Sequence, residues 1–216
     1  NYTDIPAGPL QLRHLSDLYL HPNSLTGLRL TGAELAQWLE RSVSLYHRIL
    51  PDVADQDLID PAFPSFNFDS IHGLTYQIDL SQPARFDAHG RVIDANARRI
   101  TRLLHQGLPV QPDALFVLAS NNYRSSGGAG FAGALPSNVI YDGDESNREV
   151  LEAFLRAGGQ PTAVATPPWQ FLPMPGASAV VEIALEAVGH LAEVQHLDLK
   201  PHAVSANGFR RFRLHL

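Results

Sequence analysis

The sequence predicts an α+β fold. A well-capped amphipathic helix begins near Thr31, and residues 74–80 alternate strictly between apolar and polar side chains, which is typical of a strand. The predicted strands and helices then follow one another without a regular βαβ rhythm, which disfavours a parallel α/β sheet. With 216 residues, 44% of them hydrophobic, the chain is long enough to bury a substantial core.

The N-terminal part predicts a helix, a strand and a second helix. Leucines at helical spacing predict the first helix over residues 11–20, and residues 25–30 follow as a strand. Thr31 as N-cap, with Glu34 three residues later, forms a capping-box pattern that begins the second helix. The predicted buried stripe of that helix comprises Leu35, Trp38, Leu39, Val43 and Tyr46.

The middle of the chain predicts three strands. Residues 74–80 form the first, a turn signal occupies residues 87–90, and residues 98–104 form the second. A continuous apolar run over residues 114–119 predicts a third strand, which is expected to be buried.

The C-terminal part mixes short elements. An acidic first turn predicts a helix over residues 144–156, and a shorter helix is expected over residues 185–191. Strands are expected over residues 180–183, 194–199 and 209–214.

Composition excludes several classes of protein. The net charge of −6, without a Lys/Arg stripe, argues against a nucleic-acid duplex as partner. No apolar run approaches the ~20 residues of a membrane span. Without cysteine there is neither a disulfide framework nor thiolate chemistry, and the compartment stays open. Because the chain begins at Asn1 without Met or a leader, we expect it to be part of a longer protein.

The residues offer no catalytic or metal-binding pattern. Ten histidines are present, but none has metal-ligand spacing on one helix face. Asp87 and His89 share a predicted turn, and residues 142–145 are better explained as an acidic helix start than as a cation site. There is no nucleophile elbow and no phosphate-binding loop.

Three polar corners suit ligand binding instead. The loop after the apolar run at 114–119 holds an aromatic ring that could serve as a stacking platform. A second corner precedes the strand at 25–30, and a third precedes the strand at 74–80. Asparagine amides there could read the edge of a base, although core aromatics and turn-capping asparagines would explain the same residues. The candidates are Tyr123, Asn122, Arg124, Gly127 and Gly128 in the first corner, His21 and Asn23 in the second, and Phe66 and Phe68 in the third.

These corners lie in longer motifs that carry a family resemblance. The motifs are residues 4–9, 17–23, 31–32 with 38–40, 66–69, 73–79, 82–85, 96–100 and 121–124 with Gly127-Gly128. Together they resemble the C-terminal domain of the 5'-nucleotidase family, in particular its bifunctional 2',3'-cyclic-nucleotide 2'-phosphodiesterase/3'-nucleotidases. The resemblance covers residues 1–157, and the remainder matches only loosely.

The resemblance implies a layered α/β/β/α fold in which residues 1–216 form one nucleotide-binding C-terminal domain. It implies a hydrolase whose metallophosphoesterase domain precedes this chain and holds a pair of divalent metals of the Mn, Zn, Mg or Co class. The implied substrates are 2',3'-cyclic nucleotides and 3'-nucleotides, and the implied location is the periplasm. This chain would bind substrate and be inactive alone.

The resemblance also implies roles for individual residues. One of the two rings that enclose the base matches Tyr123, and the base-contacting asparagine matches Asn23. The second ring falls at His21, where the family has Tyr or Phe, and an Asp of the 5'-nucleotidases falls at Ala129.

Three alternatives stay open. The chain could be the specificity domain of a 5'-nucleotidase or UDP-sugar hydrolase, a free-standing binding module, or a catalytic unit by itself.

Overall fold

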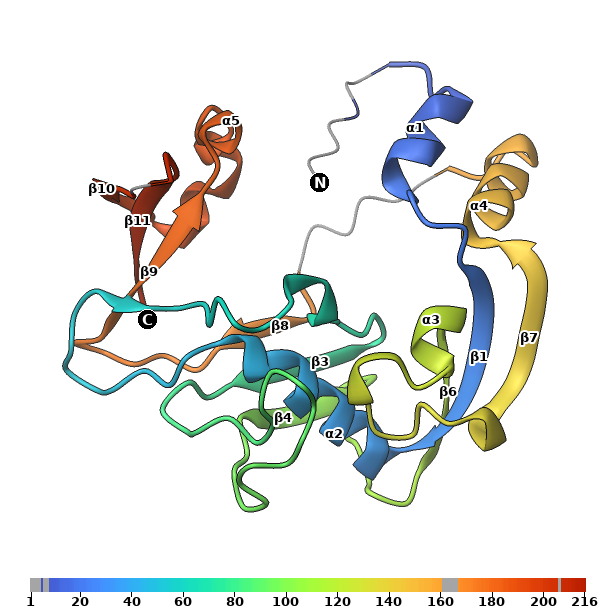
Figure 1. Ribbon diagram of the computed structural model, residues 1–216, viewed down its shortest axis with the longest axis horizontal. Coiled ribbons are helices and arrows are strands. Elements are labelled where there is room, and N and C mark those ends of the chain that lie inside the picture. The colour runs from blue at the N-terminus through green and yellow to red at the C-terminus, as the bar shows by residue number, and fades with distance from the viewer. Residues whose placement is uncertain (1–4, 6–7, 161–166, 206) are drawn as a thin grey trace. The chain divides into compact units, whose positions relative to one another are not determined.

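The computed structural model describes residues 5, 8–160, 167–205 and 207–216, which form two compact units (Figure 1). The first unit comprises the chain up to Leu35 together with the segment from Gln111, and the second comprises Ala36–Val110 and Pro167–Leu216. Both combine sheets with helices, so the predicted α+β class is confirmed. The motif at residues 4–9 lies largely outside the described residues.

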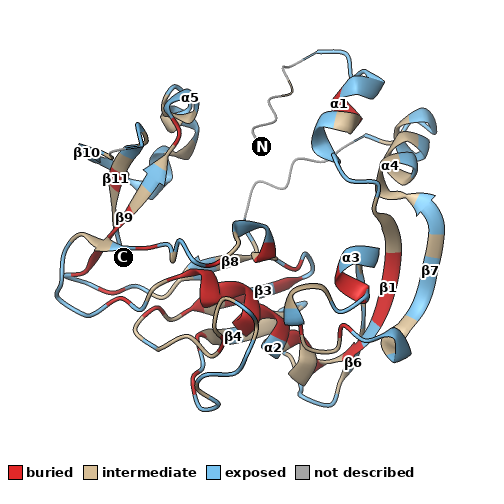
Figure 2. Ribbon diagram, in the orientation of Figure 1, coloured by how far each residue is buried: buried red, intermediate tan, exposed pale blue. Residues whose placement is uncertain are grey.

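The first unit is built on a three-stranded antiparallel sheet in the order β6-β1-β7. The strands are β1 (Ser24–Thr31), β6 (Leu115–Asn121) and β7 (Val139–Ser146). Figure 2 shows the middle of β1 buried and most of β7 exposed. The sheet therefore has one central strand and two edges.

The apolar run at 114–119 forms a strand, β6, but that strand is not buried as predicted. Leu115 and Val117 are 68% and 67% exposed. β6 pairs only with β1 and lies at an edge of an antiparallel sheet, where one face can point to solvent. The continuous apolar run therefore predicted the strand correctly but its burial wrongly.

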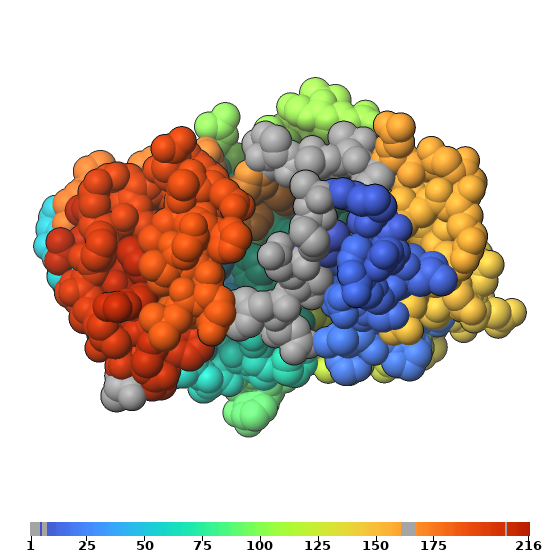
Figure 3. Space-filling model, turned by 90° about the horizontal axis from the view of Figure 1, so that it is seen from above, coloured from blue at the N-terminus to red at the C-terminus, as the bar shows by residue number. Residues whose placement is uncertain are grey.

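Helices cover parts of the first unit. α1 (Leu12–Leu18) packs against α4 (Asn147–Arg156), and the two lie side by side in Figure 3 as the blue and amber segments. α4 begins later than predicted because Ser146 is its N-cap: the Ser146 hydroxyl accepts from Glu149 N–H (3.2 Å). Residues 144–146 belong to β7 instead. Short helical turns are α3 (Asn122–Ser125), η3 (Gly128–Gly130) and η4 (Pro136–Asn138).

The predicted capping box begins α2 (Gly32–Ser42). The Thr31 hydroxyl accepts from Glu34 N–H (3.2 Å), and the Glu34 carboxylate accepts from Thr31 N–H (2.7 Å). The predicted stripe is buried throughout, although Val43–Leu45 is a 3-10 turn, η1.

The second unit contains two four-stranded sheets, both mixed. In the order β5-β4-β3-β8 the strands are β5 (Leu108–Pro109), β4 (Ile100–His105), β3 (Leu74–Ile78) and β8 (Trp169–Phe171). In the order β10-β11-β9-β2 they are β10 (Lys200–Val204), β11 (Arg210–His215), β9 (Ser178–Ile183) and β2 (Gln56–Asp57). β3–β8 and β2–β9 are the parallel pairs. The helical segments are η2 (Ser65–Asn67), α5 (Leu185–Val188) and η5 (Leu191–Leu197).

The predicted strand at 194–199 is wrong. Residues 191–197 form η5, and Asp198 then takes left-handed backbone (φ 46°), which ends the element. The strand is β10 instead, an exposed edge strand that includes Pro201.

Two buried charged side chains, Glu40 and Arg99, join α2 to the start of β4 through hydrogen bonds to the backbone. The Glu40 carboxylate accepts from the backbone N–H groups of Arg99 (2.9 and 3.1 Å) and Ile100 (2.9 Å). The Arg99 guanidinium donates to the carbonyls of Gln82 (3.0 Å), Val43 (3.0 Å) and Tyr46 (2.6 Å). Both side chains are buried, at 3% and 1% exposed, so each needs these partners.

Glu40 should make stability fall as the pH rises above about 4.5. Burial raises the pKa of Glu40, against the opposing hydrogen bonds from Ile100 and Arg99. The folded chain therefore binds a proton at pH values where the unfolded chain has lost it, so the free energy of unfolding decreases across that window.

Glu40→Gln should remove this decrease. Urea unfolding at several pH values between pH 4 and pH 7 measures the free energy of unfolding of both proteins. As the pH rises, the stability of the variant should increase relative to that of the wild type. A pH-independent difference would contradict the raised pKa.

Candidate functional site

Two of the three predicted corners meet at one end of the β6-β1-β7 sheet. β1 and β6 are antiparallel, and Leu25 at the start of β1 pairs with Asn121 at the end of β6. The segment that enters β1, residues 21–23, therefore lies beside the loop that leaves β6. No local sequence signal gives this pairing, because the strands are almost a hundred residues apart.

Asparagine side chains and backbone link the segments at this end. Asn122 Oδ1 accepts from the backbone N–H of Ser24 (3.3 Å), which joins the loop to the start of β1. The carbonyl of Asn23 accepts from Asn147 N–H (2.8 Å) at the start of α4. The backbone of Asn23 is thus held, while its side chain stays half-buried and available to a ligand.

Tyr123 lies on α3 with its ring over a glycine. Asn121 caps α3 by accepting from Arg124 N–H (3.0 Å), and Tyr123 remains 45% exposed. A Cβ at Gly128 would collide with the carbonyl oxygen of Tyr123 and approach two of its ring carbons to 3.2 Å. Gly127 has left-handed backbone (φ 88°), which favours glycine. The two glycines let the loop fold back beneath the ring.

Arg124 is buried rather than presented to solvent. It is 5% exposed, and its guanidinium carbon lies 5.3 Å from the ring centroid of Tyr123 and 4.6 Å from that of Phe131. A guanidinium over an aromatic face is attracted to it, so Arg124 supports the Tyr123 ring from within.

The remaining predicted residues divide between the two units. His21 is exposed in the segment that enters β1. Phe66 and Phe68 belong to the second unit, where Phe66 is 67% exposed. The Phe68 ring contacts those of Tyr46 and Trp169, each with its centroid 5.7 Å away, and so packs in an aromatic cluster.

Sequence reasoning missed a groove beside the loop. It has a volume of about 490 Å³ and is lined by Tyr19, Leu25, Asn147, Phe154 and residues 119–121, among others. Tyr19 belongs to the same sequence motif as His21, so its place in the groove could have been suspected. The residues of α4 line the groove only because of how that helix packs, and no sequence pattern predicts this packing.

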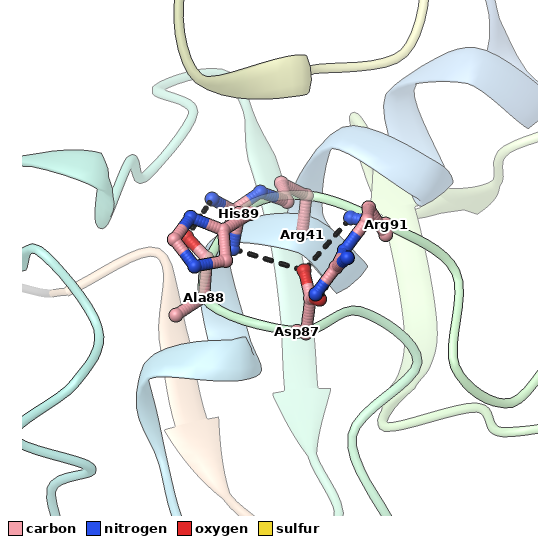
Figure 4. Close-up of polar contacts among 5 residues, drawn as sticks. All are labelled: Arg41, Asp87, Ala88, His89 and Arg91. Atoms are coloured by element: carbon pink, nitrogen blue, oxygen red, sulfur yellow. Dashed lines mark hydrogen bonds and ion pairs between the residues drawn. The ribbon is translucent and has the colours of Figure 1, made fainter.

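The Asp87 and His89 pair is explained as a turn. Asp87 Oδ1 accepts from the N–H groups of His89 and Arg91 (2.9 Å each), and Oδ2 accepts from Arg91 Nε (2.7 Å) (Figure 4). The backbone N–H of Arg91, followed by the Arg91 side chain and His89 N–H, lowers the pKa of Asp87. Arg41 holds the same turn by donating to the Ala88 carbonyl (3.0 Å).

No group of three or more His, Asp or Glu in residues 5, 8–160, 167–205 and 207–216 is arranged to hold a metal ion. Within the same residues, no helix is both long and apolar enough to cross a membrane.

Fold and site together define an α+β domain with a candidate ligand site at one end of an antiparallel sheet. The family model of the 5'-nucleotidase C-terminal domain matches residues 1–135, and the chain therefore belongs to this family.

Curated relatives and solved structures agree with this assignment. A trifunctional nucleotide phosphoesterase protein of Bacillus subtilis is 37% identical over 86% of this chain and 13% of its own length. The 2',3'-cyclic-nucleotide 2'-phosphodiesterase/3'-nucleotidase of Haemophilus influenzae is 36% identical (81% of this chain, 27% of the relative), and that of Salmonella typhimurium is 37% identical (81% and 28%). The chain thus spans less than a third of the length of these relatives.

The fold has counterparts in two crystal structures. A 5'-nucleotidase of Staphylococcus aureus matches with a TM-score of 0.58 at 21% identity, covering 74% of this chain and 29% of that one. A 5'-nucleotidase precursor of Thermus thermophilus matches with a TM-score of 0.55 at 22% identity, covering 79% and 29%. At these identities the likeness concerns the fold alone.

Proposed function

We propose that this chain is the substrate-binding domain of a 2',3'-cyclic-nucleotide 2'-phosphodiesterase/3'-nucleotidase. One observation carries the proposal: two of the predicted binding corners lie together at one end of the sheet. The hydrogen bond from Ser24 N–H to Asn122 Oδ1 joins them. The names of relatives at 36–37% identity support this choice of substrate class.

In this proposal the base stacks on Tyr123, whose ring is half-exposed and backed by Gly128 and Arg124. Arg124 acts as a positioning residue because it is buried beneath the ring. The Asn23 amide can pair with the base edge, and the His21 imidazole supplies the second stacking surface. The role of Phe66 and Phe68 in binding stays a prediction from the sequence.

Hydrolysis is assigned to a metallophosphoesterase domain outside residues 1–216. A pair of divalent metals of the Mn, Zn, Mg or Co class would activate water and neutralise the phosphoryl oxygens there. In this proposal the present chain contributes substrate binding and orientation. The proposed location of the whole enzyme is the periplasm.

A 5'-nucleotidase or UDP-sugar hydrolase is the second candidate. The family model, that of the 5'-nucleotidase C-terminal domain, supports it. The substrate profile of the full-length enzyme distinguishes the two, since a preference for 5'-nucleotides over 3'-nucleotides would select this candidate.

Calorimetric titration of the chain with adenosine 3'-monophosphate tests the proposal. We expect saturable binding, and we expect Asn122→Leu to weaken it by about fivefold, because losing one hydrogen bond costs about 1 kcal/mol and frees the two loops. Asn122→Asp keeps the acceptor and should bind more tightly than the leucine variant.

Asn138→Leu is the matched control, since Asn138 Nδ2 donates to the Gly133 carbonyl (3.0 Å) in the same unit but outside the candidate site. Its affinity should equal that of the wild type. Absence of nucleotide binding to the wild-type chain would refute the proposal.

A further inference from the structure

Residues 19–23 connect the end of α1 to the start of β1 without regular secondary structure of their own. They carry His21 and Asn23, two residues of the proposed nucleoside site. Within the described part of the chain, no hydrogen bond holds residues 20–22. The placement of the His21 ring and the Asn23 amide therefore depends on what fixes the two ends of this segment.

Both ends of the segment are bound by adjacent residues in the first turn of α4. The Arg148 guanidinium donates through Nη2 to the carbonyl of Tyr19 (2.6 Å). The backbone N–H of Asn147 donates to the carbonyl of Asn23 (2.8 Å). The two carbonyls stand four residues apart in the sequence, with His21 midway between them. α4 thus holds the segment at one point on each side of His21.

Both bonds satisfy groups at helix ends. The Asn147 N–H is the first of α4, where N–H groups have no partner within the helix and carry the positive end of its dipole. Tyr19 is the C-cap of α1, where a nearby cation is favourable. The start of α4 is itself fixed, because the Glu149 carboxylate accepts from Ser146 N–H (2.7 Å) in the capping box. The two donors are therefore in place before a ligand binds.

The residues between the two points have few free torsions. Pro22 fixes its own φ, and it restricts the preceding residue, His21, to extended backbone. Beyond the segment, Ser24 N–H is bonded to Asn122 Oδ1 (3.3 Å), next to Tyr123. With both ends held, the segment presents the His21 ring beside the loop that carries Tyr123.

The Arg148 side chain contributes little to the stability of the fold. Its Nε is buried without a hydrogen-bond partner among the described residues, and a buried donor without an acceptor is destabilising. Its bond to Tyr19 lies at an exposed position, where water can replace the guanidinium. Removing the side chain should therefore change the free energy of unfolding little, while it releases one end of the segment.

We propose that Arg148 is a positioning residue for the base, acting through the Tyr19 carbonyl on the segment that carries His21 and Asn23. This inference rests on the proposed nucleoside site. When the bond is lost, the segment adopts other conformations, and the apparent affinity falls with the fraction of molecules in which it is correctly placed. Arg148 thereby affects binding without contacting the ligand.

Calorimetric titration of the chain with adenosine 3'-monophosphate, combined with urea unfolding, tests this role. Arg148→Met should weaken binding by about tenfold, as expected if the segment is correctly placed in about a tenth of the molecules. Its free energy of unfolding should stay close to that of the wild type. Arg148→Lys can still donate to one carbonyl and should recover most of the affinity. Arg156→Met is the matched control, since Arg156 lies on the same helix but pairs with Glu152 (2.7 Å), and it should bind like the wild type.

Amide hydrogen exchange at Asn147 adds a readout that needs no ligand. Its N–H is bonded to Asn23, so it should exchange faster in Arg148→Met than in the wild type. The inference is overturned if Arg148→Met binds like the wild type, if it loses stability together with affinity, or if Arg148→Lys recovers nothing. If the wild-type chain binds no nucleotide, the proposed function fails, and the exchange rate at Asn147 decides by itself whether Arg148 holds the segment.

Discussion

Replacing Tyr123 with alanine is expected to weaken the binding of adenosine 3'-monophosphate by about tenfold or more. Stacking of a base on an aromatic ring contributes about 1–3 kcal/mol, and 1.4 kcal/mol corresponds to a factor of ten. In the full-length enzyme the same change should raise KM with little effect on kcat, because the ring contacts a part of the substrate that does not react. Tyr123→Phe keeps the stacking surface and should retain most of the affinity.

Tyr141→Ala provides the matched control for this experiment. Tyr141 is a half-exposed tyrosine of the same unit, and its ring also lies over a glycine, with Cε1 3.0 Å from a Cβ built on Gly143. Both substitutions therefore remove a similar local contact. If Tyr141→Ala weakens nucleotide binding as much as Tyr123→Ala does, the effect is structural and Tyr123 is not the stacking ring.

The parts of the fold that were predicted correctly depend on local signals. The capping box of Thr31 and Glu34 starts α2 as expected, because both partners lie within one turn of the helix. The alternation at 74–80 gave β3 because one face of that strand is buried. Such signals need no knowledge of distant segments.

The errors arise where tertiary position decides. β7 was not predicted, because Asp142 and Asp144 on an exposed edge strand resemble the acidic start of a helix. Leu115 and Val117 look like core residues until the edge position of β6 is known. In both cases the composition of the segment is compatible with two environments, and only the neighbouring strands distinguish them.

The candidate site shows the same division. The residue types of the loop at 119–131 indicated a ligand contact, but the partner segment follows from the long-range pairing of Leu25 with Asn121. The burial of Arg124 could not be predicted from the sequence either, because arginine is mostly exposed in proteins. The need for glycine at position 128 follows from the carbonyl oxygen of Tyr123, with which a Cβ there would collide.

Replacing Arg99 with methionine is expected to lower the free energy of unfolding of the second unit by about 3–5 kcal/mol, because each buried acceptor left without a donor costs about 1–3 kcal/mol. Three backbone carbonyls, those of Gln82, Val43 and Tyr46, would lose their donor, and Glu40 would lose a neighbouring cation. Burial lowers the pKa of Arg99 to about 10, which still leaves it charged at neutral pH. Urea unfolding followed by tryptophan fluorescence measures the change, since Trp38 and Trp169 both lie in this unit.

Two further variants show whether the loss comes from the donors of Arg99. Arg99→Lys keeps the charge but cannot reach three carbonyls with a planar fork, so its stability should fall between wild type and Arg99→Met. Arg98→Met removes the neighbouring exposed arginine and should cost less than about 1 kcal/mol. If Arg99→Met costs no more than Arg98→Met, then the packing of methionine compensates for the lost hydrogen bonds, as happens where the desolvation cost of a buried charge offsets the energy of its contacts. The junction between α2 and β4 would then be held by apolar packing, and the carbonyls of Gln82, Val43 and Tyr46 would have to be satisfied by water.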